Sequence, residues 1–241
     1  MKLKEVLLDT RSFEAMKAFY GSLLDLQVVE EGPSRLSFQV GESVLAFQES
    51  SQMENEFYHI AFTIPTNKFI EAKQWAIDRG ITLITRSQED EFFFENWNAT
   101  AFYFYDPDHN LIEFIAHHTL DNAVTEAFGP HSLLRISEIG LPVDDVPEVS
   151  KIITETFQLN SWGGAGQKFA PLGDVEGSFI VTDKQRPWFP DDRLPAVFGI
   201  HVLFEGTCSA RLSLHKGLYG LRSIHKTPDF WNKSRSGKIR G

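Results

Sequence analysis

His59 and Glu113 have the chemistry and the sequence setting of a metal-ligand pair. His59 lies in an alternating apolar segment at residues 58–64, and Glu113 lies in a second one at residues 110–115. Alternation with a period of two, with many aromatic and β-branched residues, predicts that both segments are β-strands. An imidazole and a carboxylate that share one face of a sheet can bind a divalent metal ion. The alternative is that both are polar residues on solvated strand faces.

Two sequence segments carry a family resemblance. They are Tyr-His-Ile-Ala-Phe at residues 58–62 and Phe-Tyr-Phe-Tyr-Asp-Pro-Asp-His-Asn-Leu-Ile-Glu-Phe at residues 102–114. Together they resemble the vicinal oxygen chelate superfamily, which includes glyoxalase I, bleomycin- and fosfomycin-resistance proteins, and extradiol ring-cleavage dioxygenases. The resemblance implies an α+β fold in which paired βαβββ modules surround one metal ion.

The predicted elements repeat the same order along the chain. Ser12 is the expected N-cap of the first helix. The first two modules are predicted as strands at residues 3–8, 27–31, 35–40 and 43–48 with a helix at 15–24, then strands at 58–64, 81–85, 99–105 and 111–116 with a helix at 68–78. The later elements are predicted as strands at residues 135–143, 168–171, 177–182 and 198–204 with a helix at 149–157.

The repeat predicts two tandem halves, of which the second is incomplete. Residues 1–118 are expected to form a vicinal oxygen chelate domain from modules one and two. Residues 132–241 are expected to form a second, degenerate half with a basic C-terminal tail, because no counterpart of the Asp-Pro-Asp-His-Asn-Leu-Ile-Glu segment follows His201. Alignment of the modules matches Glu5 with Glu138 and His59 with His201.

The resemblance also implies a third metal ligand from the first strand of module one, and the equivalent residue is Glu5. Glu49, at the end of the last strand of that module, is a fourth candidate. The predicted set is therefore Glu5, His59 and Glu113, holding a divalent ion such as Fe, Mn, Ni or Zn. An exposed Glu5 without a ligand role is the competing interpretation.

Trp97 and Tyr103 are candidates for the wall of a substrate cavity, although aromatic residues in strands also occur commonly in cores. Cys208 has no recognisable base partner, and no catalytic residue is assigned. The predicted function is a metal-dependent enzyme that acts on a small molecule with adjacent oxygens. The reaction class placed first is that of the extradiol ring-cleavage dioxygenases. The alternatives are a glyoxalase-like lyase or isomerase, or a metal-free binding protein of the bleomycin-resistance kind.

Composition and charge argue against several other classes of protein. The 241 residues carry a net charge of -10, which argues against a general nucleic-acid binder despite the basic segment after residue 211. There is no apolar run near the ~18 residues of a membrane span, and the charged N-terminus does not resemble a secretory leader. A single cysteine suits a reducing compartment. The expectation is a cytoplasmic protein that acts on a small-molecule substrate, with a homodimer as a candidate assembly.

Overall fold

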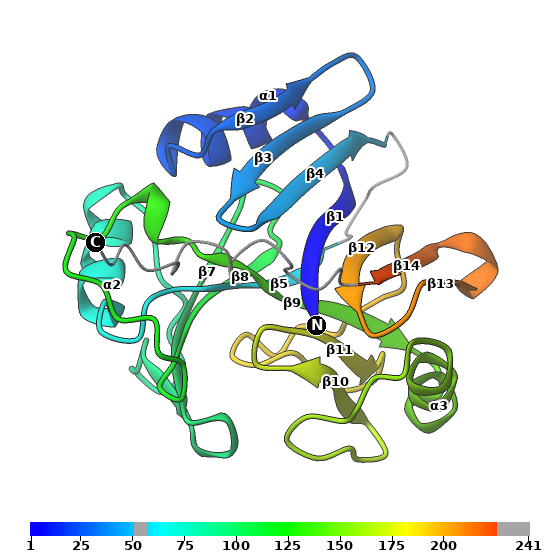
Figure 1. Ribbon diagram of the computed structural model, residues 1–241. Helices are drawn as coiled ribbons and strands as arrows, with labels where there is room; N and C mark the ends of the chain where they lie inside the picture. Colours follow the sequence, from blue (N-terminus) through cyan, green and yellow to red (C-terminus); the bar gives the residue numbers. More distant parts are fainter. Residues whose placement is uncertain (51–56, 226–241) are drawn as a thin grey trace, which may run out of the picture.

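The computed structural model describes residues 1–50 and 57–225 (Figure 1). The strands are β1 (Lys2–Thr10), β2 (Val28–Glu31), β3 (Leu36–Val40), β4 (Ser43–Glu49), β5 (His59–Thr63), β6 (Phe92–Phe94), β7 (Ala99–Tyr105), β8 (Leu111–His117), β9 (Arg135–Val143), β10 (Phe169–Asp174), β11 (Gly177–Asp183), β12 (Ile200–Gly206), β13 (Ala210–Leu214) and β14 (Tyr219–His225). The helices are α1 (Phe13–Met16), continued by a π-helix over Lys17–Leu23, α2 (Phe69–Asp78) and α3 (Val146–Phe157), with 3-10 turns at Glu95–Trp97, Pro130–Ser132 and His215–Gly217.

These strands form two seven-stranded sheets. Sheet A has the order β13-β14-β12-β1-β4-β3-β2, and sheet B has the order β10-β11-β9-β5-β8-β7-β6. Both sheets mix parallel and antiparallel neighbours. The predicted fold of paired βαβββ modules is confirmed, with a last module whose described part contains β12, β13 and β14 but no α-helix.

The modules pair differently from the expectation. β1 runs antiparallel to β12, so the first module shares sheet A with the fourth. β5 runs antiparallel to β9, so the second module shares sheet B with the third. The predicted closure of modules one and two around a common cavity is therefore wrong, and each sheet draws strands from both halves of the sequence (Figure 1).

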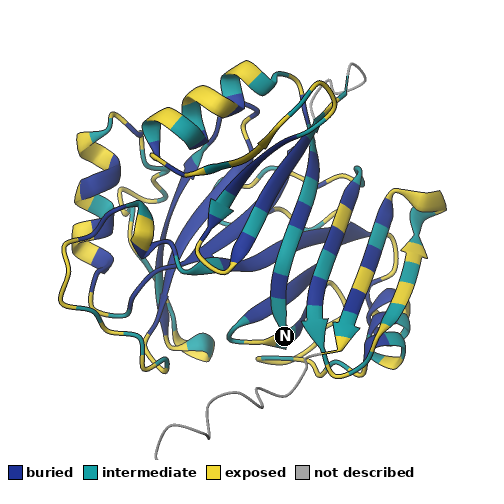
Figure 2. Ribbon diagram, turned by 45° about the horizontal axis from the view of Figure 1, so that its top comes forward, coloured by how far each residue is buried: buried dark blue, intermediate teal, exposed yellow. Residues whose placement is uncertain are grey.

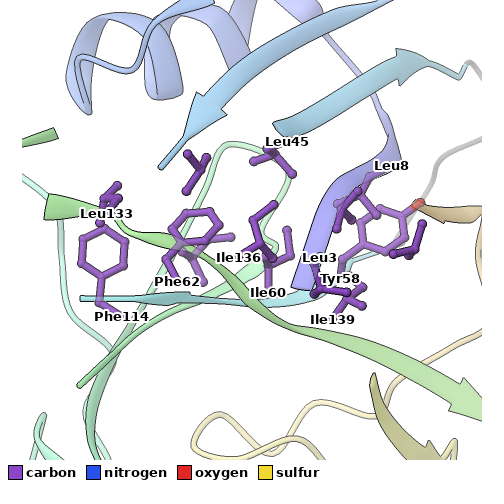
Figure 3. Packing of buried hydrophobic residues seen from close by; sticks show 14 of the residues in the cluster. Leu3, Leu8, Leu45, Tyr58, Ile60, Phe62, Phe114, Leu133, Ile136 and Ile139 are labelled. Atoms are coloured by element: carbon purple, nitrogen blue, oxygen red, sulfur yellow. The ribbon is translucent and has the colours of Figure 1, made fainter. Parts of the chain in front are cut away.

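The main apolar core lies between the two sheets and beneath the helices. Ile60 and Phe62 of β5 and Phe114 of β8 are fully buried in it, as is Leu45 of sheet A. Figure 3 shows these side chains between the strands of the two sheets. Because side chains alternate along a strand, the other face of β5 and β8 carries His59 and Glu113. Burial of each large apolar side chain stabilises the fold by roughly 1.5–3 kcal/mol, so this packing determines which way the two polar residues point.

Sheet A has one buried face and one face open to solvent. Along β12, buried Ile200, Val202 and Phe204 alternate with the exposed His201 and the half-buried Leu203. Figure 2 shows the same alternation of burial along the strands of this sheet. None of the helices in the described part of the chain has the length and apolar character that crossing a membrane requires.

Local sequence signals explain several element boundaries. The Ser12 side chain accepts a hydrogen bond from the Ala15 N–H and caps α1, as predicted. Gly80 follows α2 with φ +80°, where a glycine avoids strain. The predicted strand at residues 81–85 is wrong, because only Leu83 forms a bridge there and β6 occupies the sheet edge. β13 and β14 were not predicted, since their solvent-facing positions are polar and weaken the apolar signal.

The turn between β7 and β8 is built around the buried carboxylate of Asp106. Its Oδ1 accepts hydrogen bonds from the backbone N–H groups of Asp108 and Asn110, at 3.0 and 2.9 Å. Its Oδ2 accepts from Asn110 Nδ2 and from the Tyr20 hydroxyl, both at 2.8 Å. The turn therefore ties the first helix to the start of β8 and helps to position Glu113.

Replacement of Asp106 should destabilise the protein strongly. Asp106→Ala leaves the Tyr20 hydroxyl, the Asn110 amide and two backbone N–H groups without their acceptor in a buried site. We expect a loss of about 3–5 kcal/mol in the free energy of unfolding, measured by denaturant titration. Asp183→Ala, which removes an exposed turn hydrogen bond to Gln185, should cost about 1 kcal/mol or less. Equal losses in the two variants would contradict this role of Asp106.

Candidate metal centre

Three ionisable side chains meet on one face of sheet B. Ala61 of β5 is the Cα partner of Glu113 on β8 and of Glu138 on β9. The two glutamates therefore flank the central strand in one row, and their side chains project to the same side. His59 lies two residues before Ala61 and shares that face. The site thus draws on three adjacent strands that belong to the second and third modules.

The three side chains are close together and almost fully shielded from solvent. His59 is 5% exposed, and Glu113 and Glu138 are each 3% exposed. Nε2 of His59 lies 3.5 Å from Oε2 of Glu113 and 3.6 Å from Oε2 of Glu138. One ligand atom from each of the three residues lies within 4.8 Å of the others.

This spacing suits a divalent ion. An ion with ligands at about 2.0–2.2 Å keeps neighbouring ligand atoms roughly 3.0–3.5 Å apart in tetrahedral or octahedral coordination. The observed separations of 3.5 and 3.6 Å are close to that range. Oε1 of Glu138 is buried and has no hydrogen-bond partner in the described part of the chain. The residues present therefore fit a bound cation, which would satisfy this oxygen or its neighbour.

The second nitrogen of His59 also has the setting of a metal ligand. Nδ1 lies 3.3 Å from the backbone carbonyl oxygen of Leu111. If Nδ1 carries the proton and donates it to this carbonyl, Nε2 presents its lone pair to the two carboxylates. A backbone carbonyl that orients a histidine in this way is a common feature of protein metal sites.

The electrostatics of the site disfavour two free carboxylates. Burial raises the pKa of Glu113 well above the usual value of a glutamate, and the charge of Glu138 raises this pKa further. A hydrogen bond from the Tyr103 hydroxyl lowers it, but burial is the larger effect. Two buried carboxylates beside one imidazole leave uncompensated negative charge, which is costly away from water. A divalent cation would offset that charge.

Aromatic side chains enclose the site. The Trp188 ring packs on the His59 ring with centroids 4.8 Å apart. Next to the site is a small cavity of about 60 Å³. The residues that line it are His59, Phe94, Trp97, Tyr103, Glu138, Phe169, Ile180, Arg186, Trp188 and Phe189.

Gly140 makes room for Trp188. A Cβ at this position would lie 2.7 Å from the nearest atom of the Trp188 ring and 3.3 Å from the His59 Cβ. The absence of a side chain on β9 two residues after Glu138 therefore lets the indole cover the histidine and exclude water from it.

A larger side chain at position 140 should displace the indole. Gly140→Val forces the Trp188 ring to move, and we expect a loss of about 1–3 kcal/mol in the free energy of unfolding. The double variant Gly140→Val/Trp188→Leu should recover part of this loss, because the smaller residue vacates the space. A double-mutant cycle by denaturant titration measures the coupling. Additive effects of the two substitutions would show that the two residues do not compete for the same space.

The structure brings together two of the three predicted ligands. His59 and Glu113 share the site, but Glu5 lies in sheet A, where its carboxylate forms an ion pair with Arg35 at 2.8 Å. Glu138 occupies the place expected for Glu5, because the second module pairs with the third and not with the first. Glu49 accepts a hydrogen bond from the Phe13 N–H at the start of α1.

The sequence contained a signal that could have identified Glu138. It is the single charged residue within the otherwise uncharged run at residues 136–143, all of which are buried, whereas Glu5 lies in a strand with Lys2 and Lys4. A lone carboxylate in a continuous buried strand points to a functional role more strongly than one in a partly solvated strand. Trp97 and Tyr103, the predicted cavity residues, both lie in the wall of the cavity.

Comparison with known proteins agrees with this fold. Residues 2–114 match the family described as the Glyoxalase/Bleomycin resistance protein/Dioxygenase superfamily. The predicted resemblance to the vicinal oxygen chelate superfamily is thereby confirmed. Comparison with curated protein sequences finds no significant match.

One solved structure shows a similar fold over nearly the whole chain. A candidate dioxygenase from Bacillus subtilis subsp. subtilis str. 168 superimposes with a TM-score of 0.60 and 11% identity, covering 92% of this chain and 85% of that chain. Lactoylglutathione lyase from Agrobacterium tumefaciens is 19% identical over 46% of this chain and 90% of its own, with a TM-score of 0.39. The fosfomycin resistance protein FosX from Listeria monocytogenes, as an E126Q mutant with Mn(II) and 1S,2S-dihydroxypropylphosphonic acid, is 20% identical over 49% and 91%, with a TM-score of 0.39.

Proposed function

We propose that this protein is a metal-dependent enzyme that acts on a small molecule with two adjacent oxygen atoms. The observation that supports the proposal is the buried cluster of His59, Glu113 and Glu138 beside a cavity. A divalent ion held by these three side chains would act as a Lewis acid and polarise the oxygens of the substrate. Three protein ligands leave further coordination positions for a chelating substrate. The set of one imidazole and two carboxylates suits Mn²⁺ or Fe²⁺, with Ni²⁺ and Zn²⁺ as alternatives.

The surrounding side chains prepare the site for an anionic or polar substrate. The Tyr103 hydroxyl donates a hydrogen bond to Glu113 and so restrains one ligand. Burial raises the pKa of Tyr103 well above its usual value, so the phenol keeps its proton at neutral pH. The half-buried guanidinium of Arg186 stands over the Phe169 ring in the cavity wall, 4.3 Å from its centroid. It gives the wall a positive charge that favours a negatively charged substrate.

The aromatic wall favours a planar substrate, which supports ring cleavage of a catechol as the reaction. Trp97, Tyr103, Trp188 and Phe189 surround the cavity, and flat rings stack well on such surfaces. The cavity of about 60 Å³ is smaller than the ~150 Å³ that holds a benzene ring in an engineered protein core. A catechol would therefore require the segment that contains Trp188 and Phe189 to move outward.

The cavity volume supports a second candidate, a glyoxalase-like lyase or isomerase acting on a short aliphatic substrate. Such a substrate needs less displacement of Trp188 and Phe189. The second carboxylate also favours a lyase or isomerase, because an oxygen-rich ligand set suits Lewis-acid chemistry that involves no change of oxidation state.

One assay series separates the candidates. Protein reconstituted anaerobically with Fe²⁺ is exposed to oxygen and a panel of catechols, and a yellow ring-fission product is monitored. In parallel, protein loaded with Mn²⁺, Ni²⁺ or Zn²⁺ is tested with the hemithioacetal of a short 2-oxoaldehyde. Ring fission supports the dioxygenase, and turnover of the hemithioacetal supports the lyase. Absence of bound metal under all conditions would reject the enzyme proposal in favour of a metal-free binding protein.

The proposed centre takes all of its ligands from a single chain. His59, Glu113 and Glu138 lie on strands that pair within that chain, so no second copy is needed to complete the ligand set. The homodimer stays a prediction, and a small-molecule substrate is part of the proposal.

A further inference from the structure

Sheet A repeats the register of the candidate metal centre with different chemistry. Leu203 of β12 is the Cα partner of Glu5 on β1 and of Arg222 on β14. His201 lies two residues before Leu203, as His59 lies two residues before the central residue of sheet B. Glu5 and His201 in sheet A therefore occupy the register positions that Glu138 and His59 occupy in sheet B.

The two sheets differ at two of the paired positions beside the central strand. Arg222 occupies the position that Glu113 has in sheet B, on the strand parallel to the central one. The next strand outward contributes Arg211 opposite Arg222, where sheet B has Tyr103 opposite Glu113. A divalent cation in this second site would face a guanidinium where the first site offers a carboxylate. The substitution excludes the same type of metal centre and reverses the local charge.

The two arginines are placed side by side at an energetic cost. Arg211 and Arg222 are direct cross-strand partners, and like charges in such a pair are destabilising. Within residues 1–50 and 57–225, no carboxylate forms an ion pair with either of them. The nearest glutamate of the row, Glu5, is already paired with Arg35. A bound anion would offset the unpaired positive charge.

The arginines face a hollow that can hold a small molecule. A cavity of about 610 Å³ opens on this side of sheet A. The His201 ring lies directly over Gly220 on β14, since a Cβ there would be 2.3 Å from its Nδ1. The exposed imidazole of His201 and Gly220 both line the hollow. The residues that define this sheet A face are Glu5, His201, Leu203, Arg211, Ser213 and Arg222.

We propose that the sheet A face binds a small anion that carries a phosphate or a carboxylate group. Arg222 and Arg211 offer two planar donor groups that match two or more terminal oxygens. His201 and Ser213 supply further hydrogen-bonding groups, and Leu203 contacts the apolar part of the ligand. The site is separate from the candidate metal centre, which lies on sheet B.

Calorimetric titration with inorganic phosphate and, separately, with malonate tests the proposal. The full chain is first treated with chelator, and ionic strength is held constant with chloride. Saturable binding of at least one anion is expected, and the comparison shows whether phosphate or carboxylate is preferred. Arg222→Ala should weaken binding about ten- to hundredfold, because it removes charge-assisted hydrogen bonds. Arg222→Lys, which keeps the charge but loses the planar fork, should weaken binding less.

Two controls make the result specific. Lys151→Ala removes one exposed cation from α3 and should leave binding unchanged. His59→Ala should also leave it unchanged, which separates this site from the metal centre. Absence of saturable binding with both anions would overturn the proposal. Equal weakening by Arg222→Ala and Lys151→Ala would overturn it as well, because binding would then reflect net charge alone.

Discussion

His59→Ala should abolish stoichiometric metal binding, whereas His201→Ala should leave it intact. His59 supplies the one nitrogen ligand of the candidate centre, and its Nε2 lies within 3.6 Å of both carboxylates. Loss of a direct ligand should reduce affinity by more than the ~10–100-fold that follows loss of an outer partner. The measurement is metal content after dialysis against a competing chelator, for protein purified without chelators and loaded with Mn²⁺ or Fe²⁺.

His201 is the matched control because it occupies the same register position in sheet A. Its neighbours there include Arg222, which opposes binding of a cation. Equal loss of metal from His59→Ala and His201→Ala would show that the site was assigned to the wrong sheet, or that both sheets bind metal.

Glu138→Gln should have opposite effects on the metal-free and metal-loaded protein. Without metal, the change removes a buried carboxylate whose charge acts on Glu113 and whose Oε1 lacks a partner in the described part of the chain. We expect the metal-free variant to be more stable by about 1–2 kcal/mol, or roughly 2–8 °C in the midpoint of thermal unfolding.

With metal bound, the wild type should be more stable than Glu138→Gln. A ligand at 100 times its dissociation constant stabilises the native state by about 2.7 kcal/mol, a gain that Glu138→Gln should lose. Glu155→Gln, at an exposed position on α3, should change the free energy of unfolding by no more than about 0.5 kcal/mol with or without metal. The prediction fails if Glu138→Gln lowers the midpoint of the metal-free protein, or if variant and wild type gain equally from metal. Thermal unfolding of the wild type and both variants, each with and without added ion, gives the required midpoints.

Local sequence patterns were sufficient to locate the strands that carry His59 and Glu113. The alternation around each residue determines which face it occupies, and the core packing of Phe62 and Phe114 agrees with that parity. The turn that contains Asp106 also follows from the local sequence. Short polar side chains and a proline specify a turn within a few residues. His109 adopts φ +60° in this turn.

The third ligand could not be derived in this way, because it depends on which modules pair. β1, β5, β9 and β12 are all rich in apolar residues, and no local pattern specifies which of them pair edge to edge. The choice of β9 as the partner of β5 comes from packing between segments that are distant in the sequence. A local signal did exist in the lone carboxylate of Glu138 between Ile136 and Ile139. Without the pairing, that signal could not be connected to His59.

The most direct test of the account is an anomalous difference map from crystals of metal-loaded protein, recorded on both sides of the absorption edge of the added Mn²⁺ or Fe²⁺. We predict one peak on sheet B, about 2.0–2.2 Å from Nε2 of His59 and from a carboxylate oxygen of each of Glu113 and Glu138. A peak beside Glu5 on sheet A, or a fully loaded crystal with no peak among these three side chains, would contradict the assignment.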